Sequence, residues 1–379
     1  MDARSPHSSM ESIYLTEEHV ALRDQVARFL AKEVEPRGES WEEQGFVPRE
    51  ILRMMGELGF FGITYPVEYG GAEADALTAL VFAEAVSRTT FGGFAATVLV
   101  HTDMASPHLV NAGSRAQLDK YLPAIIRGER ITAVAVTEPD AGSDVAAIRT
   151  RARREGDGWV LNGTKMFITN GVLADLYFVA ARTDSQAKGS RGISMFIVEK
   201  GLPGFRVGRA LKKTGWLCSD TAELVFEDCH VPAENLLGEE NAGFYAVMKN
   251  FQTERIAAAA IAVGHALTAL RLTVEYVKSR KAFGGVLFDK QVIRQRLAML
   301  EARTHAARQF LYHCGWLAAQ RRDCVREVSM LKALTGELVN EVLYTCQHST
   351  AAWDTCARAP SSAWRGIRVC YPSAAARPK

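Results

Sequence analysis

Hydrophobic residues recur every three to four positions in the first third of the chain, a spacing that places them on one face of a helix. After the capping residue Thr16, for example, Leu22, Val26 and Phe29 share one face. Helices are predicted from Thr16 to Pro36 and at 48–58, 76–86, 94–109 and 114–126. This pattern indicates an N-terminal helical domain over residues 13–128.

The period changes near residue 131, where short runs rich in β-branched and aromatic residues begin. Strands are predicted at 131–136, 159–168, 176–181, 192–198, 205–209 and 222–227. Because no helices separate these runs, they favour an antiparallel barrel or sandwich over residues 129–238. Gly158 to Lys165 resembles a phosphate-binding loop, but Thr164 stands where the lysine is required, so we expect a hairpin that turns at Asn162-Gly163.

Helical spacing returns at about residue 241. One long helix, or two, is predicted over 244–278, with further helices at 290–321 and 325–344. Residues 239–344 are therefore expected to form a four-helix-type bundle. The predicted fold class is α+β, with a middle β domain between two helical domains.

Composition excludes several classes of protein. The 379 residues include 45 Lys and Arg against 43 Asp and Glu, and this net charge of +2 argues against nucleic-acid binding. The apolar run from Ile256 to Val263 is far shorter than the ~20 residues of a membrane span, and the polar opening lacks a secretory signal, so a cytoplasmic protein is expected. The seven cysteines have no metal-binding spacing, and a structural role is favoured for His101 and His108, so no metal site is predicted.

Two segments of the predicted β domain carry candidate chemistry. Residues 136–144 offer hydroxyls and backbone amides in a tight loop, which suits a polar ring edge or a phosphate. Residues 166–170 place the Phe167 ring and the Thr169 hydroxyl two positions apart, on one face of a strand. Each segment alone is compatible with an ordinary turn and strand.

Together these segments resemble the acyl-CoA dehydrogenase family. Four motifs occur in the family's order: T-E-P-x-A-G-S-D from Thr137, N-G-x-K-x-x-I-T-N from Asn162, the segment Cys218 to Pro232, and S-R-K-A-F-G from Ser279. The resemblance covers residues ~13–344. It implies bound FAD, oxidation of an acyl-CoA thioester to the trans-2-enoyl-CoA, and an electron-transferring flavoprotein as the electron acceptor.

The resemblance also implies roles for individual residues. FAD would be bound by Val136, Thr137, Ser143, Phe167, Ile168 and Thr169, with the Phe167 ring stacked on the flavin and Ser143 also close to the substrate. Arg280, Phe283 and Gln291 would reach the FAD of a neighbouring subunit, which implies a homodimer or homotetramer. From the residues alone, the favoured interpretation of Arg280 is a cation that stabilises a helix end, and the resemblance reverses this preference.

Removal of the substrate's α-proton requires a base, and a carboxylate whose pKa is raised by desolvation is suitable. Family members carry this Glu either in a late loop or early in the long helix, directly before an Arg, and Glu254-Arg255 matches the second place. Residues three and four positions from Glu254 include no cation, so it lacks a local ion-pair partner. The resemblance implies that Glu254 is the catalytic base and that Arg255 binds substrate. The alternative is a surface Glu, or one paired across domains.

The tail at 345–379 departs from the family pattern. It lacks the expected G-G-x-G segment, and residues 346–379 carry five Lys or Arg against one Asp, a net charge of +4. A shifted reading frame would restore the family motifs, so we interpret the tail as frame-shifted and expect weakened FAD binding or assembly.

The alternatives to a dehydrogenase are an acyl-CoA oxidase or a non-catalytic relic that is impaired by this tail. A flavin-dependent hydroxylase or nitroalkane-type relative would not need Glu254. Acyl chain length and branching cannot be read from the sequence.

Overall fold

The computed structural model describes residues 12–187 and 189–350, which form two compact units. Each unit combines segments that are far apart in the sequence. We call them the β unit and the helical unit. Within the described residues, the β unit consists of 37–74 and 91–255 and the helical unit of 12–36, 75–90 and 256–350.

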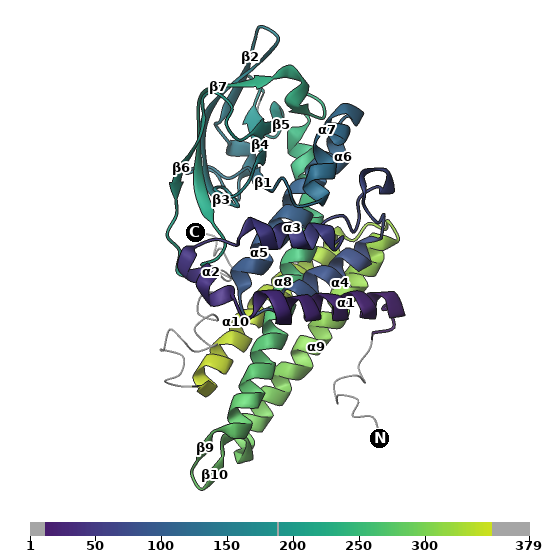
Figure 1. The fold of residues 1–379 in the computed structure, drawn as a ribbon, viewed down its shortest axis with the longest axis vertical. Helices are drawn as coiled ribbons and strands as arrows, with labels where there is room; N and C mark the ends of the chain where they lie inside the picture. The colour runs from purple at the N-terminus through teal and green to yellow at the C-terminus, as the bar shows by residue number, and fades with distance from the viewer. Residues whose placement is uncertain (1–11, 188, 351–379) are drawn as a thin grey trace. The chain divides into compact units, whose positions relative to one another are not determined.

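An eight-stranded sheet forms the centre of the β unit (Figure 1). Its strands are β1 (Thr132–Ala135), β2 (Arg151–Glu155), β3 (Gly158–Thr169), β4 (Leu176–Arg182), β5 (Ile193–Glu199), β6 (Phe205–Ala210), β7 (Thr221–Pro232) and β8 (Leu236–Leu237). The strand order is β6-β7-β3-β2-β4-β5-β8, and β1 pairs with β4. Six of these strands were predicted from the sequence, whereas β2 and the two-residue β8 were not.

The sheet corrects two details of the predicted β domain. It is not wholly antiparallel, because β1 runs parallel to β4 and β2 meets β4 in one parallel pair. The hairpin between β2 and β3 turns between Glu155 and Gly158, and not at Asn162-Gly163, which lies inside β3. Asn162 exchanges hydrogen bonds with Asp228 of β7 beside an irregularity in the register. The Asn-Gly pair therefore marks a bulge in this strand.

Helices and short helical turns complete the β unit. The α-helices are α2 (Gly38–Gln44), α3 (Arg49–Glu57), α5 (Gly92–Leu99), α6 (Ser106–Ala112), α7 (Arg115–Ile126) and the first part of α8 (Gly243–Ser279). The single helix predicted over 94–109 is divided by the π-helix η3 (Val100–Ala105), which widens the turn between α5 and α6. The remaining turns are η2 (Val67–Tyr69), η4 (Val145–Ala147) and η5 (Ala233–Asn235).

The helical unit is built from long helices. They are α1 (Glu17–Phe29), extended by the π-turn η1 (Leu30–Val34), α4 (Ala76–Val86), α9 (Gln291–Ala319), α10 (Val325–Thr350) and the rest of α8. A hairpin of β9 (Lys281–Ala282) and β10 (Gly285–Val286), followed by η6 (Leu287–Asp289), joins α8 to α9. Helix α10 continues past Tyr344, where the sequence predicted its end, because Cys346, Gln347 and Thr350 are buried.

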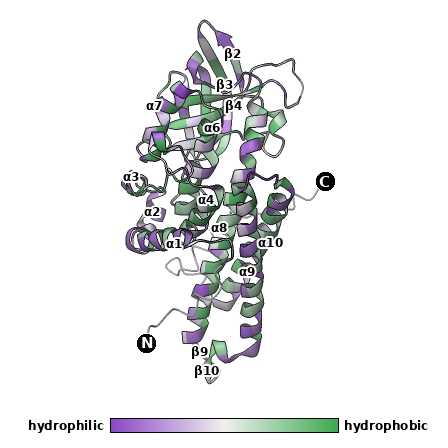
Figure 2. Cartoon of the chain, turned by 90° about the vertical axis from the view of Figure 1, so that its right-hand side faces the viewer, coloured by the Kyte–Doolittle hydropathy of each residue, from purple (hydrophilic) through white to green (hydrophobic). Residues whose placement is uncertain are grey.

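Helix α4 forms the centre of the helical unit. Residues Leu80 to Val86 are all buried, and Figure 2 shows α4 as largely hydrophobic. The exception is Glu84, which bonds to Arg88 at one carboxylate oxygen and to Arg308 and Tyr312 at the other. Burial alone would raise the pKa of Glu84, but Arg88 and Arg308 lower it to about 2. These ion pairs and hydrogen bonds stabilise the charged Glu84 carboxylate in the apolar core of the helical unit.

Helix α8 is one continuous helix of 37 residues, so the segment predicted as one long helix or two is a single helix. It is the one helix among residues 12–187 and 189–350 that is long and apolar enough to cross a membrane by length and composition. However, 72% of its most apolar window is buried inside the structure, as in a core helix of a folded protein.

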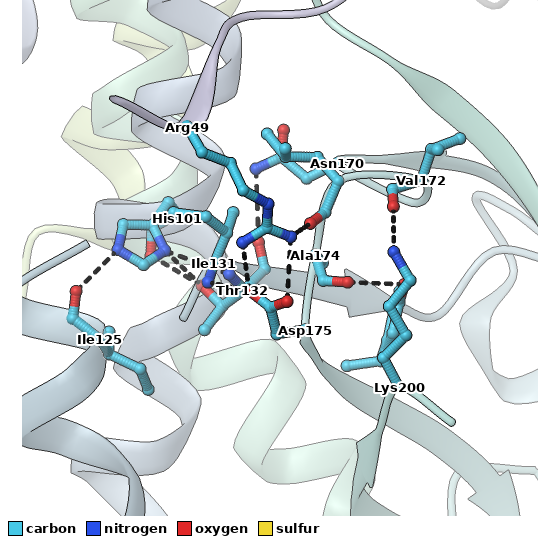
Figure 3. Close-up of polar contacts among 12 residues, drawn as sticks. Arg49, His101, Ile125, Ile131, Thr132, Asn170, Val172, Ala174, Asp175 and Lys200 are labelled. Carbon is cyan, nitrogen blue, oxygen red and sulfur yellow. Dashed lines mark hydrogen bonds and ion pairs between the residues drawn. The ribbon is translucent and has the colours of Figure 1, made fainter. Parts of the chain in front are cut away.

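A polar network fixes the start of β1 in the β unit (Figure 3). Asp175 accepts two hydrogen bonds from the Arg49 guanidinium, at 2.8 and 2.9 Å, and one from the Ile131 backbone at 2.8 Å. His101 and Asn170 bond to Thr132, one residue further along. The network therefore holds β1 against the ends of β3 and η3. The structural role predicted for His101 agrees with these contacts.

Candidate active site

The two segments singled out in the sequence lie side by side in the β unit. The Met166 backbone N–H donates to the Thr137 carbonyl oxygen at 2.9 Å. The Lys165 ammonium donates to the Val136 carbonyl oxygen, also at 2.9 Å. Residues 136–137 and 165–166 therefore lie side by side, although almost thirty residues separate them in the chain. We call these two paired segments the strand edge.

A buried ion pair supports this edge from within. Lys165 is fully buried, and its Nζ lies 2.8 Å from Oε1 of Glu138. The Glu138 carboxylate also accepts hydrogen bonds from the backbone N–H groups of Arg149 and Thr150. Burial alone would raise the pKa of Glu138, but the Lys165 ammonium and these donors hold it below its usual range. Glu138 and Lys165 thus fix the backbone on both sides of Thr137.

Phe167 has an unusual conformation for an aromatic residue in a strand. Its φ of 61° lies in the left-handed region, within the register shift between Lys165 and Ile168. Its ring is 65% exposed, whereas the neighbouring Ile168 is buried. Backbone strain of this kind is concentrated at functional sites. The bulge therefore presents a flat apolar surface beside the edge formed by Val136 and Thr137.

The remaining candidate residues in this part of the β unit are hydroxyl-bearing. Thr169 is half-buried at the end of β3, where it pairs with Thr221 of β7. Ser143 is exposed, just after the tight turn in which Glu138 and Ala141 pair. Both hydroxyls can form hydrogen bonds with a ligand that lies against the strand edge.

Glu254 lies in the first part of α8, also in the β unit. Its side chain is 19% exposed, and its Oε1 accepts a hydrogen bond of 3.0 Å from the Asn250 amide. Burial raises the pKa of Glu254 to about 7, although Asn250 and Arg255 act in the opposite direction. A carboxylate with this pKa can accept a proton at neutral pH.

The other candidate residues are on α8, in the connection that follows it and at the start of α9. Arg255 is half-buried next to Glu254 on α8. Arg280 and Phe283 are exposed in the connection between α8 and α9, and Gln291 is exposed as the first residue of α9, all within the helical unit. The Phe283 ring is 84% exposed at a φ of 53°.

Comparison with known proteins assigns the fold and the class. The chain matches the acyl-CoA dehydrogenase N-terminal domain over residues 16–129, the middle domain over 133–229 and the C-terminal domain over 241–350. The chain therefore belongs to the acyl-CoA dehydrogenase family, as its motifs suggested.

Individual relatives agree with this assignment. A mouse long-chain specific acyl-CoA dehydrogenase is 40% identical over 339 residues, which is 89% of this chain and 78% of the relative. The crystal structure of an acyl-CoA dehydrogenase from Geobacillus kaustophilus superposes with a TM-score of 0.90 at 38% identity, covering 95% of this chain and 94% of that one. A Mycobacterium smegmatis glutaryl-CoA dehydrogenase solved with FADH2 has a TM-score of 0.88 at 27% identity and covers 94% and 90% of the two chains.

FAD is the cofactor of this family, and the residues in the β unit fit it. The exposed Phe167 ring offers a flat surface suited to stacking on a planar ring system. Thr137 and Thr169 are half-buried and Ser143 is exposed, so their hydroxyls are placed where a bound ligand could reach them. The predicted cofactor is therefore compatible with the chemistry of the site.

No role was assigned from the sequence to Lys165, Glu138 or Asn250, and only a structural role to His108. Lys165 and Glu138 lie within recognised motifs, but only the structure reveals their buried ion pair. Asn250 stands one helical turn before Glu254, a spacing that could have identified it as a partner. His108 comes from α6, and no local signal connects it with Glu254. Such a contact depends on how the helices pack.

Proposed function

We propose that this enzyme oxidises the α,β-carbon bond of an acyl-CoA thioester to give the trans-2-enoyl-CoA, with Glu254 as the base. The observation that carries the proposal is the Glu254 carboxylate, which is 19% exposed in the β unit, is bonded to the Asn250 amide and has a pKa raised to about 7 by burial. A thioester α-proton is weakly acidic, so a desolvated carboxylate is a suitable acceptor for it.

The chain's own residues divide the remaining work. Bound FAD supplies the acceptor for the hydride that leaves the β-carbon. Val136, Thr137, Ile168 and Thr169 hold the ring, Phe167 packs on it, and Ser143 serves both cofactor and substrate. Arg255 binds substrate, while Glu254 takes the proton and retains it until the product leaves.

A panel of acyl-CoA thioesters under anaerobic conditions tests the proposed reaction. We expect at least one straight or branched thioester to bleach the flavin absorbance, with one enoyl-CoA formed for each flavin. The thioester that reacts fastest identifies the chain length and branching. Rapid peroxide formation in air would instead identify an acyl-CoA oxidase, and bound acyl-CoA without bleaching would identify a non-catalytic protein.

The rate of this reaction is expected to depend on pH. Only the deprotonated form of Glu254 can accept the α-proton, and burial raises its pKa to about 7. The value of kcat/KM should therefore fall about tenfold for each pH unit below 7 and level off above it. Stopped-flow flavin reduction across this range measures the profile. An unchanged rate down to pH 5 would exclude Glu254 as the titrating base.

We further propose that the chain assembles as a homodimer or homotetramer and passes electrons to an electron-transferring flavoprotein. Exposure of Arg280, Phe283 and Gln291 between the end of α8 and the start of α9 supports assembly, because an exposed aromatic ring with polar groups nearby in the chain suits contact with a neighbouring subunit. One structural neighbour, at a TM-score of 0.91, comes from a study of the electron transferring flavoprotein of Acidaminococcus fermentans.

A further inference from the structure

Asn250 is buried on α8, one turn before Glu254, and its side chain is surrounded by polar atoms. Its amide nitrogen Nδ2 lies 2.9 Å from the Met104 carbonyl oxygen, 3.0 Å from Oε1 of Glu254 and 3.4 Å from Nε2 of His108. These partners come from η3, α8 and α6, all within the β unit. Asn250 therefore connects three elements at the candidate base.

The Met104 carbonyl determines which way the amide faces. A backbone carbonyl oxygen can only accept a hydrogen bond, so the amide must present its nitrogen on that side. An amide nitrogen carries two hydrogens, which suffice for Met104 and Glu254. The amide oxygen is left buried without a hydrogen-bond partner among the described residues. Such an unpaired acceptor costs free energy, which indicates that the orientation of the amide serves another purpose.

His108 completes the surroundings of the carboxylate. Its Nε2 lies 3.9 Å from Oε1 of Glu254, but burial lowers the pKa of His108 to about 4. The imidazole is therefore neutral at pH 7, and the contact is not an ion pair. Its ring lies near Phe178 of β4, with the ring centroids 6.3 Å apart. His108 thus places an uncharged ring beside the carboxylate.

We propose that Asn250 is a positioning residue for Glu254. The Met104 carbonyl fixes the Asn250 amide so that an N–H faces the carboxylate and holds it in position. The His108 ring lies on the adjacent side of the carboxylate. The proposal deepens, and rests on, the proposed function of Glu254 as the base. Asn250 assists proton removal without contacting substrate or cofactor.

The arrangement has a consequence for the protonation of Glu254. A donor that faces a carboxylate favours its charged form, so Asn250 opposes the rise in pKa that burial causes. The other groups that act on Glu254 are Arg255 on α8, which also lowers its pKa, and neutral His108 on α6. Removal of the Asn250 amide should therefore raise the pKa of Glu254 further.

The test replaces Asn250 with leucine in the full-length, FAD-bound protein. The protonated carboxyl of Glu254 is followed by infrared spectroscopy during a pH titration, and its band is identified by its loss in Glu254→Gln. We expect Asn250→Leu to shift the titration to higher pH and to lower kcat/KM at pH 7 about 10-fold, with recovery as the pH rises. Asn250→Ala, which favours helix, should shift both in the same direction if the leucine variant folds poorly.

Asn340→Leu is the matched control. Asn340 is also an asparagine on a helix, and its amide donates to the Gly336 carbonyl of the preceding turn, far along the chain from Glu254. It should leave the Glu254 titration unchanged. The proposal is overturned if the folded Asn250 variants titrate like the wild type, or if their rates fall equally at every pH. Failure of the wild type to reduce its flavin with any acyl-CoA would refute the proposed function, while the infrared titration would still test the contact.

Discussion

Replacement of Glu254 by glutamine is expected to abolish acyl-CoA oxidation while leaving FAD bound. Glutamine keeps nearly the same shape but cannot accept the α-proton, and loss of a positioned base lowers rates by roughly 10³-fold. Flavin content should be unchanged, because the residues proposed to hold the ring lie in the segments 136–143 and 167–169, and Glu254 is not among them. Flavin absorbance and the rate of anaerobic flavin reduction measure the two effects separately.

Glu275→Gln is the control for this substitution. Glu275 lies on the same helix but is exposed, where it pairs with Arg271 one turn earlier. The change should affect turnover little, because exposed ion pairs contribute little to stability. Turnover by Glu254→Gln at the level of the Glu275→Gln control would show that another group removes the proton.

Replacement of Lys165 by methionine is expected to destabilise the protein and to reduce FAD binding. The substitution leaves the Glu138 carboxylate buried without its cation and removes the donor to the Val136 carbonyl. Loss of one partner of a buried ion pair costs about 3 kcal/mol in the free energy of unfolding. Urea denaturation of the β unit within the full chain and the flavin-to-protein ratio measure the two consequences.

The double variant Lys165→Met with Glu138→Gln separates charge from packing. Because it leaves no unpaired charge, it should regain part of the stability lost in Lys165→Met. The recovery should be partial, because Arg149 and Thr150 donate to different carboxylate oxygens and glutamine retains only one acceptor oxygen. If the single variant is as stable as the wild type and binds FAD fully, the buried pair does not support the strand edge formed by residues 136–137 and 165–166.

Much of the fold could be predicted from the sequence because its periodic segments are long. The predicted helix at 76–86 matches α4, and the predicted strand at 176–181 differs from β4 by one residue. Strand β2 was missed because Arg151–Glu155 is mostly charged and exposed, so its hydrophobic pattern is weak. The grouping of α4 with α9 and α10 depends on packing between distant segments, which local spacing does not encode.

The candidate site was predictable only as far as its motifs extend. Val136, Thr137 and Phe167 belong to recognisable segments, and the structure places these segments on one edge. The contacts of His108 and the Met104 carbonyl with Asn250 could not be predicted, because they join α6 and η3 to α8 through tertiary packing. Residues 351–379 of the tail lie outside the described residues. Their effect on FAD binding remains a prediction.

The central claim is that Glu254 removes the proton in a flavin-dependent oxidation of acyl-CoA. Rapid anaerobic mixing of the FAD-bound protein with its best acyl-CoA, before and after Glu254→Gln, tests the claim most directly. The account predicts full flavin bleaching with one enoyl-CoA formed per flavin in the wild type, and a yellow, unbleached variant that still binds the thioester. Bleaching of both proteins at similar rates would contradict it.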